Sequence, residues 1–337
     1  MNYGKFPIVS VADSIPANMC MTRDAMASGM AFLVGELEKR DEKLHEPLTS
    51  VTWARDIPVK TGGGLVDGVA IFDVSYSTSG GSNDGIMAQQ TNDLPIIQAD
   101  IGKDIARTFM WGHTLKVPLI DQQRLRQIGR SLDDILDKGL HLAHDKAVDG
   151  SVYVGFKQYG SYGLVNNPAI TTATAAPHTA NGSDTQWKGK TPDEILADVD
   201  KIVMGTWEAS ELDPSGMANH ILIPPEQYAH LVHTKVGVTG DKSILTYLLE
   251  NNLATNQGFN LFIAPCRWCT GAGTGGTNRM VGYANNIDRV RFDMTYPLQR
   301  VMTQASAEHL AYLTPYIAQW TEVQWIYHTC AMYIDGI

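Results

Sequence analysis

The sequence contains few cysteines, a deficit of basic residues and no long apolar run, and each shortage excludes a class of protein. Only four cysteines occur in 337 residues (Cys20, Cys266, Cys269 and Cys330), too few for a disulfide framework, which favours a reducing compartment. No stretch approaches the roughly 18 apolar residues of a membrane span, and the first residues lack a secretory signal pattern. The 26 basic and 36 acidic residues give a net charge of −10, which argues against a broad cationic surface for a phosphate backbone.

What the sequence does contain is a globular composition, with 44% hydrophobic and 18% charged residues, which can build a sizeable core in about two domains. Residues 24–44 carry apolar side chains at helical spacing and predict an amphipathic helix in an N-terminal arm. Residues 51–94 alternate between apolar and polar types and include Gly/Ser-rich turns, which predicts an extended β-hairpin. Because a two-stranded ribbon is only marginally stable alone, this hairpin indicates a partner-binding element.

The most regular pattern lies in residues 119–148. Apolar residues recur there every three or four positions and predict one long helix of about 40 Å at 1.5 Å per residue. Its other face has arginines near the N-terminal end and aspartates further along, opposite to the preference of the helix dipole; the arginines are Arg124, Arg126 and Arg130. These charges either contact neighbouring proteins or form a solvated helix face.

The remainder of the chain divides at a connector. Residues 171–190 are mostly small and polar and mark a candidate boundary. Thr191 is followed by Pro192 and Glu194, which predicts a helix with Thr191 as its N-cap. Helices and strands then alternate to about residue 295, which predicts a compact mixed α/β domain, and residues 296–337 are rich in strand-forming residues.

Residues 264–279, APCRWCTGAGTGGTNR, combine two patterns that could carry chemistry. Glycines 271, 273 and 276 fit G-x-G-x-x-G, but a dinucleotide site needs that turn directly between a strand and a helix, and here the following residues are strand-like. Cys266 and Cys269 have the spacing of half a zinc site, while the second pair of ligands is missing and Cys330 with His328 is the only other combination close in sequence. A glycine-rich hairpin loop explains the same residues.

Two histidines on the predicted long helix offer a second candidate for metal binding. His141 and His144 stand three residues apart, with Asp145 beside them, so both imidazoles could lie near one face. The HExxH motif is absent, and a long amphipathic helix readily carries histidines on its polar side. We therefore expect them on the polar side, and no catalytic arrangement has a local signature.

The order of the elements resembles that of a known family. The segments that carry the resemblance are EPLTSVTWARDIPV, HDKAVDGSVYVGF, GLVNNPAI, ILIPPEQYAHL, ILTYLLENN, RMVGYANN and MYIDGI. In this order they are similar to the major capsid proteins of tailed bacteriophages, in the branch that carries an uncharacterised capsid domain. The resemblance implies the Hong Kong 97-type capsid fold, an α+β fold that encapsulin shells share.

The resemblance also implies a division of the chain. It comprises an N-terminal arm (residues 1–48), an extended β-hairpin loop (49–112), a peripheral domain with a spine helix and connector (113–190), an axial domain (191–295) and C-terminal strands that return to the peripheral domain (296–337). On the hairpin, Arg55 and Asp67 are candidate assembly contacts, and on the spine helix Arg124 and Arg130.

The function implied by the resemblance is structural. The chain would self-assemble into hexamers and pentamers of an icosahedral shell around double-stranded DNA that it contacts only weakly, in the virion capsid after assembly in the host cytoplasm. It would need no cofactor and no membrane. Portal and decoration proteins are expected partners, and since Met1 lies close to the arm helix, either a separate scaffold protein exists or a propeptide has been removed. The alternatives are an encapsulin-type compartment and a soluble metal- or nucleotide-dependent enzyme built on residues 260–280.

Overall fold

The computed structural model describes residues 49–79, 96–127, 132–179, 182, 184–236 and 242–337. The chain divides into two compact units, Met1–Ser50 and Val51–Ile337, and the architecture concerns the second unit. Of the first unit only residues 49 and 50 are described, and both are exposed. The predicted N-terminal arm with its helix at 24–44 therefore lies outside the described residues.

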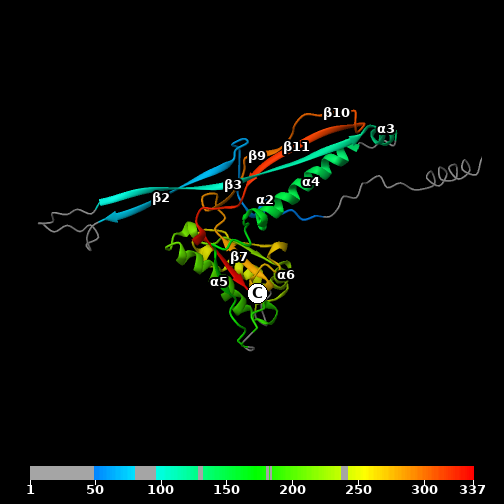
Figure 1. Cartoon of the computed structure of the whole chain (residues 1–337). Coiled ribbons are helices and arrows are strands. Elements are labelled where there is room, and N and C mark those ends of the chain that lie inside the picture. The colour runs from blue at the N-terminus through cyan, green and yellow to red at the C-terminus, as the bar shows by residue number, and fades with distance from the viewer. Residues whose placement is uncertain (1–48, 80–95, 128–131, 180–181, 183, 237–241) are drawn as a thin grey trace, which may run out of the picture. The chain divides into compact units, whose positions relative to one another are not determined.

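One continuous strand, β3 (Ile96–Pro118), organises the first sheet (Figure 1). Its first half pairs antiparallel with β2 (Gly68–Ser79), from Gly68 opposite Arg107 to Ser79 opposite Ile96. Its second half pairs with β11 (Ala311–Thr321), which also pairs with β9 (Tyr296–Arg300) and β10 (Gln304–Ser306). The predicted hairpin is therefore a two-stranded extension of a larger sheet.

Two helical segments are described after β3, where one long helix was predicted. They are α3 (Leu119–Gln127) and α4 (Leu132–Tyr153), and the single-helix prediction is not tested across residues 128–131, which lie outside the described part. Helix α4 runs beside β3 and β11 (Figure 1). Trp320 Nε1 donates to Ser151 Oγ at 3.0 Å, which joins β11 to the helix.

The second sheet has the strand order β4-β13-β7-β5-β6. Its strands are β4 (Thr171–Thr174), β5 (His220–Ile223), β6 (Phe262–Pro265), β7 (Arg279–Tyr283) and β13 (Ala331–Asp335). The helices between them are α5 (Pro192–Ala209), α6 (Pro225–His233), α7 (Ile244–Glu250) and α8 (Leu253–Asn256). Thr191 caps α5 in a reciprocal capping box with Glu194, which confirms the predicted helix start.

This second sheet is covered on both faces. Along β7, Met280 packs into a cluster with the α5 side chains, while Val281 and Tyr283 pack into a second cluster with the end of α4. Strand β5 alternates in the same way, with Ile221 in the first cluster and Leu222 in the second. Since successive strand residues point to opposite faces, the sheet separates two hydrophobic cores.

The third sheet corrects one prediction. Residues 51–61 were expected to open the hairpin, but the structure has a one-turn helix, α2 (Trp53–Asp56), and a short strand, β1 (Val59–Thr61). Strand β1 pairs parallel with β8 (Val290–Met294), whose other edge pairs with β12 (Gln324–Trp325). The Trp53 ring packs 6.2 Å from that of Phe292, so burial against β8 overrides the alternating local pattern.

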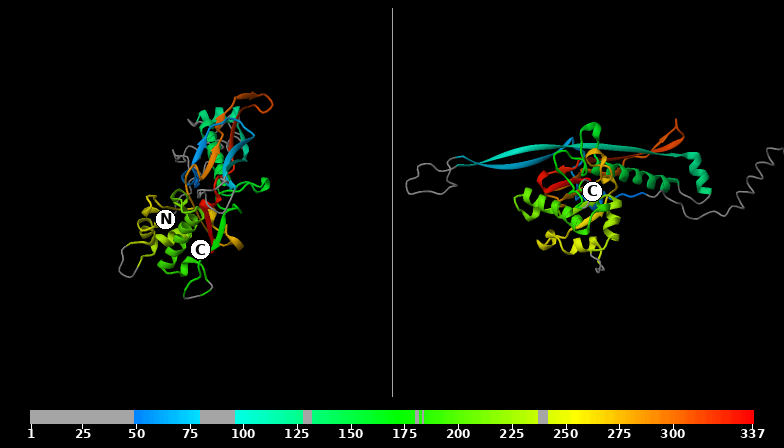
Figure 2. Two further views of the ribbon diagram at one scale, coloured as in Figure 1. Left: turned by 90° about the vertical axis from the view of Figure 1, so that its left-hand side faces the viewer. Right: turned by 90° about the horizontal axis from the view of Figure 1, so that it is seen from below.

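The C-terminal strands are shared between sheets. Strands β9 to β11 join the sheet of the hairpin, whereas β13 lies between β4 and β7 in the second sheet. Figure 2 shows from two further sides the long strand β3 and the helices of the second sheet. The combination of helices with three sheets is the α+β class predicted. Among the described residues, no helix combines the length and the apolar character needed to cross a membrane.

Candidate assembly surfaces

The hairpin of β2 and β3 has two chemically different faces. Directly opposed residues of an antiparallel pair share a face, and the faces alternate along each strand. We call the even-numbered residues 70–78 with the odd-numbered residues 97–105 the apolar face, since it pairs Val74 with Ile101 and Tyr76 with Ala99. The opposite face, which we call the polar face, carries Asp73, Asp100 and Asp104.

The apolar face is exposed in the described part of the chain. Phe72 is 65% exposed, Tyr76 77% and Ile101 66%. Soluble monomers rarely expose contiguous apolar patches of this kind unless the patch binds something. Lys103 is the only charged residue on this face, opposite Phe72. The hairpin therefore presents an apolar ribbon with one cation at its centre.

A buried carboxylate anchors the chain just before the hairpin. Asp56 is completely buried and accepts hydrogen bonds from Arg55, whose Nε lies 2.6 Å from Oδ1 and whose Nη2 lies 2.9 Å from Oδ2. The Tyr153 hydroxyl at the end of α4 donates to the same carboxylate, and the Tyr283 hydroxyl of β7 donates to the Asp56 carbonyl. We call these residues, together with His220, the Asp56 cluster.

His220 completes the cluster from β5. Its Nε2 lies 3.3 Å from Asp56 Oδ1, and Asn285 Nδ2 lies 3.3 Å from its Nδ1. An amide nitrogen can only donate, so Nδ1 accepts and the proton is on Nε2, facing the carboxylate. Burial alone would raise the pKa of Asp56, but the hydrogen bonds from His220, Arg55 and Tyr153 outweigh it and hold that pKa below its ordinary value. The cluster thus joins α2, α4 and the second sheet around one ionised group.

The four candidate contacts chosen from the sequence are not brought together. Arg55 is engaged within its own subunit, through Asp56, the Pro265 carbonyl at 3.2 Å and the Phe262 ring. Asp67 is exposed immediately before β2. The Arg124 side chain and all of Arg130 lie outside the described part of the chain. A role between subunits therefore stays a prediction for all four.

The loop of residues 264–279 is held by two carboxylates of its own subunit. Asp149 accepts from Arg267 Nη2 and Trp268 Nε1, both at 2.9 Å. Asp335 accepts from Thr274 N at 2.8 Å and from Arg279 Nε at 2.6 Å. The loop joins β6 to β7, which lie on either side of β5, so the expectation of a hairpin loop is wrong. These contacts explain its conformation without a ligand.

The cysteines and glycines of this loop are accounted for by packing and backbone geometry. Cys266 and Cys269 are buried in a hydrophobic core, and burial raises the pKa of Cys269. Gly271, Gly275 and Gly276 have φ values of 67°, 71° and 80°, where residues with a Cβ are strained. Within the described residues, no group of three or more His, Cys, Asp or Glu side chains could hold a metal ion.

His144 departs from its predicted place on the polar side of the helix. It is only 5% exposed, with its ring 5.3 Å from that of Trp111 and 5.6 Å from that of Trp320. Its Nε2 is buried and has no hydrogen-bond partner, and burial lowers its pKa. His141 remains more than half exposed, 3.7 Å from Asp137. The α4 face toward β3 and β11 therefore includes a position that the sequence pattern assigned to solvent.

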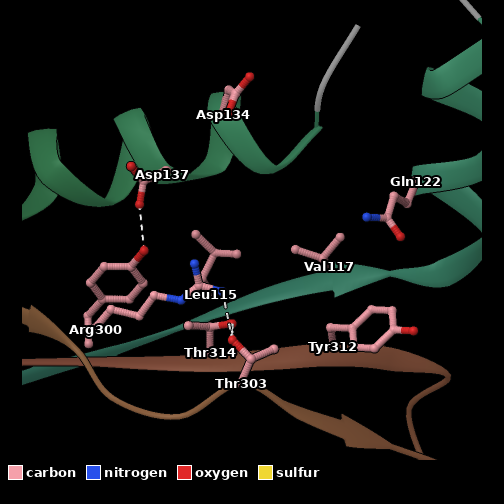
Figure 3. A pocket seen from close by; sticks show the side chains of 10 residues that line it. Leu115, Val117, Gln122, Asp134, Asp137, Arg300, Thr303, Tyr312 and Thr314 are labelled. Carbon is pink, nitrogen blue, oxygen red and sulfur yellow. Dashed lines mark hydrogen bonds between the residues drawn. The ribbon is translucent and has the colours of Figure 1, made fainter.

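A cavity of about 300 Å³ lies between the first turns of α4 and the sheet (Figure 3). We call it the α4 pocket. Asp134 and Asp137 line it from the helix, and Leu115, Val117 and Tyr312 line it from the strands. Tyr316 donates to Asp137 Oδ1 at 2.6 Å, and Arg300 Nη2 donates to Thr303 Oγ1 at 2.7 Å. The pocket thus combines the inward-facing carboxylate of Asp137 and the guanidinium of Arg300 with apolar and aromatic walls.

Comparison with known proteins identifies relatives of this architecture. The family model described as "Major capsid protein" matches residues 83–337. Among solved structures, the capsid of Myoviridae phage XM1 is 15% identical with a TM-score of 0.74, and the match covers 90% of this chain and 98% of that one. A structure from Microbacterium phage Oxtober96 is 11% identical with a TM-score of 0.60 over 90% and 98% of the chains. The capsid of an empty GTA particle is 10% identical with a TM-score of 0.55 over 94% and 99%. No curated protein matches.

Proposed function

The chain belongs to the major capsid protein family, and we propose that it forms hexamers and pentamers that close into the icosahedral head of a tailed bacteriophage around double-stranded DNA. It is a shell-forming structural protein of the virion, not an enzyme, and it has the Hong Kong 97-type fold of the phage capsids that it resembles. The family match favours this function over the encapsulin and enzyme alternatives, which no specific observation in the described residues supports.

The observation that carries the proposal is the exposed apolar face of the hairpin. A hairpin that extends beyond its own sheet and exposes Phe72, Tyr76 and Ile101 needs a surface to cover it. A second copy of the chain supplies that surface in a shell of identical subunits. Because the hairpin of one copy meets a different patch on the next, the contact is heterologous, and heterologous contacts that close generate rings such as pentamers and hexamers.

We propose the domain assignment on the same basis. Residues 49–112 form the extended loop, residues 113–190 and 296–337 the peripheral domain, and residues 191–295 the axial domain. Support comes from α4 packing beside β3 and β11, and from the separate second sheet with its own helices. Two strands within the peripheral ranges, β4 and β13, depart from this division, because they belong to the same sheet as the axial strands β5, β6 and β7.

The remaining partners are proposed from charge and from the needs of a shell. A net charge of −10 favours weak contact with packaged DNA, because tight binding would require many cations against the phosphates. A scaffold, a portal and decoration proteins are the expected partners, and assembly takes place in the host cytoplasm before the subunit becomes part of the virion.

The proposal is tested by electron microscopy and sedimentation of the purified chain under assembly conditions, with co-expressed scaffold where one exists. The wild type should form capsomers, shells or tubes. Val74→Lys should reduce the shell yield at least tenfold, because Val74 is on the apolar face and is 53% exposed. Ser75→Lys is the matched control, one residue along the same strand on the polar face, and should assemble like the wild type.

Two results would count against the proposed function. A wild-type chain that stays a compact monomer under every assembly condition would contradict self-assembly itself. Equal shell yields for Val74→Lys and Ser75→Lys would leave the shell in place but would show that the apolar face is not what the neighbour covers.

A further inference from the structure

We propose that Lys103 of one copy enters the α4 pocket of a neighbouring copy and forms an ion pair with Asp137 there. This inference rests on the proposed function, because it concerns a contact between copies within the shell. It names the surface of the second copy that receives the hairpin and the residue pair that sets the register of the contact.

The first step concerns the cation. Lys103 lies on the apolar face, flanked along its strand by Ile101 and Ile105 and opposed by Phe72. When a neighbour covers this face, the ammonium group loses water along with the apolar side chains. An ammonium buried without a partner of opposite charge is strongly unfavourable. The covering surface must therefore provide a carboxylate among apolar groups.

The second step concerns the pocket. The α4 pocket offers the carboxylate of Asp137, which points toward the strands above walls formed by Leu115, Val117 and Tyr312 (Figure 3). The carboxylate of Asp134 points away from the strands. Arg300 also lines it, but its guanidinium donates to Thr303 Oγ1 at 2.7 Å. Tyr316 donates to Oδ1 of Asp137 at 2.6 Å, and His141 Nε2 lies 3.7 Å from Oδ2. The carboxylate is 43% exposed and has further lone pairs to accept from an ammonium. The pocket thus places the Asp137 carboxylate beside apolar walls, as the apolar face places the Lys103 ammonium among apolar side chains.

The third step excludes a contact within one chain. Lys103 and Leu115 belong to the same continuous strand, and their separation is 115 − 103 = 12 residues. At about 3.3 Å per residue this corresponds to roughly 40 Å, far beyond the reach of a lysine side chain. Any pairing of Lys103 with the pocket must therefore join two copies. Since the two patches differ, the pairing has the heterologous geometry that closes rings.

The decisive experiment is cross-linking with a bis-maleimide in assembled shells, because the Cα atoms of a lysine–aspartate pair can lie beyond the roughly 7 Å that a disulfide bridges. Lys103→Cys and Asp137→Cys are combined in one chain, the shells are treated with the reagent, and the products are separated on denaturing gels. A ladder of linked oligomers up to closed rings is expected. Each single variant, and the combination of Lys103→Cys with Asp184→Cys at an exposed carboxylate elsewhere, should give no ladder.

The outcomes separate this inference from the proposed function. Normal shells of the double variant without a ladder would overturn the inference while the shell function stands, whereas failure of the wild type to assemble would overturn the function. If the double-cysteine variant forms no shells, charge reversal decides. Lys103→Glu should then reduce shell yield at least tenfold and Lys103→Glu with Asp137→Lys should restore most of it. Asp100→Lys is the matched charge reversal on the polar face. If Lys103→Glu and Asp100→Lys gave equal shell yields, the pairing of Lys103 with Asp137 would be refuted.

Discussion

Replacing Asp56 with alanine should destabilise the subunit more than any other single change in charge at the hairpin base. The substitution removes a fully buried carboxylate that pairs with Arg55 and accepts from Tyr153 and His220. Those donors would lose their shared acceptor at the junction of α2, α4 and the second sheet. The Arg55 side chain is itself 36% exposed, so the cost comes mainly from the buried hydrogen bonds of Tyr153 and His220, at about 1–3 kcal/mol for each unsatisfied group. We expect a total loss of about 3 kcal/mol.

That cost is large relative to the stability of a folded domain. Free energies of unfolding are commonly about 5–15 kcal/mol, so Asp56→Ala should remove about a fifth or more of the total. For a unit of this size the melting temperature should fall by roughly 10 °C. Asp56→Asn retains hydrogen-bonding capacity without the charge and should give a smaller loss.

The assay is urea or thermal unfolding of the unassembled subunit, followed by tryptophan fluorescence. Asp67→Ala is the control, since Asp67 is exposed eleven residues further along and its loss should change the free energy of unfolding by at most about 0.5 kcal/mol. Because the pKa of Asp56 is lowered in the folded state, its stabilisation is complete above the ordinary value near 3.8 and is lost as the pH falls through the folded value. A loss below about 1 kcal/mol at neutral pH would refute the assignment of the cluster as an anchor.

Three further predictions concern stability. Because the pKa of His144 is lowered in the folded state, the unfolded chain binds the proton at a higher pH than the folded chain does. The stability of the wild type should therefore decline as the pH falls below about 6.5, by at most about 1.4 kcal/mol per pH unit. His144→Phe should show a shallower decline in thermal melts at pH 5 to 7. Gly282→Ala should cost about 3 kcal/mol in urea unfolding, because a Cβ there would overlap Ile202 Cγ2 on α5. Thr191→Ala should cost about 1 kcal/mol in the same assay through loss of the N-cap, and an unchanged midpoint would show that the α5 cap is dispensable.

The elements that the sequence predicts well are those whose signals are local. The start of α5 depends on Thr191 and Glu194, which lie three residues apart and bond to each other. Two prolines follow the strand at 220–223, where the strand pattern ends, and the second of them begins the helix that ends at residue 233. By contrast, the turn of helix at Trp53 forms in contact with Phe292, so nothing near residue 53 predicts it.

The apolar face was not among the candidate contacts, because these were chosen from the sequence by charge and not by hydrophobic alternation. The segment from Phe72 to Ser77 alternates apolar and polar residues, and this period-two pattern could have identified the apolar face. Arg55 was chosen for its charge, yet its partner Asp56 is buried against Tyr153 and His220. These two residues lie 97 and 164 positions further along the sequence. Separations of that length leave no trace in a single sequence.

The anchor and the apolar face together explain how a long hairpin can serve assembly. A free ribbon would have to be ordered at the moment of contact, and ordering reduces affinity. Here β3 continues without interruption from the hairpin into the sheet that pairs with β11, and the Asp56 cluster holds the segment that leads into β2. The apolar face is therefore already formed before a neighbour arrives. It follows that changes in the Asp56 cluster should alter the unfolding of the isolated subunit, whereas changes on the apolar face should alter assembly and leave that unfolding nearly unchanged.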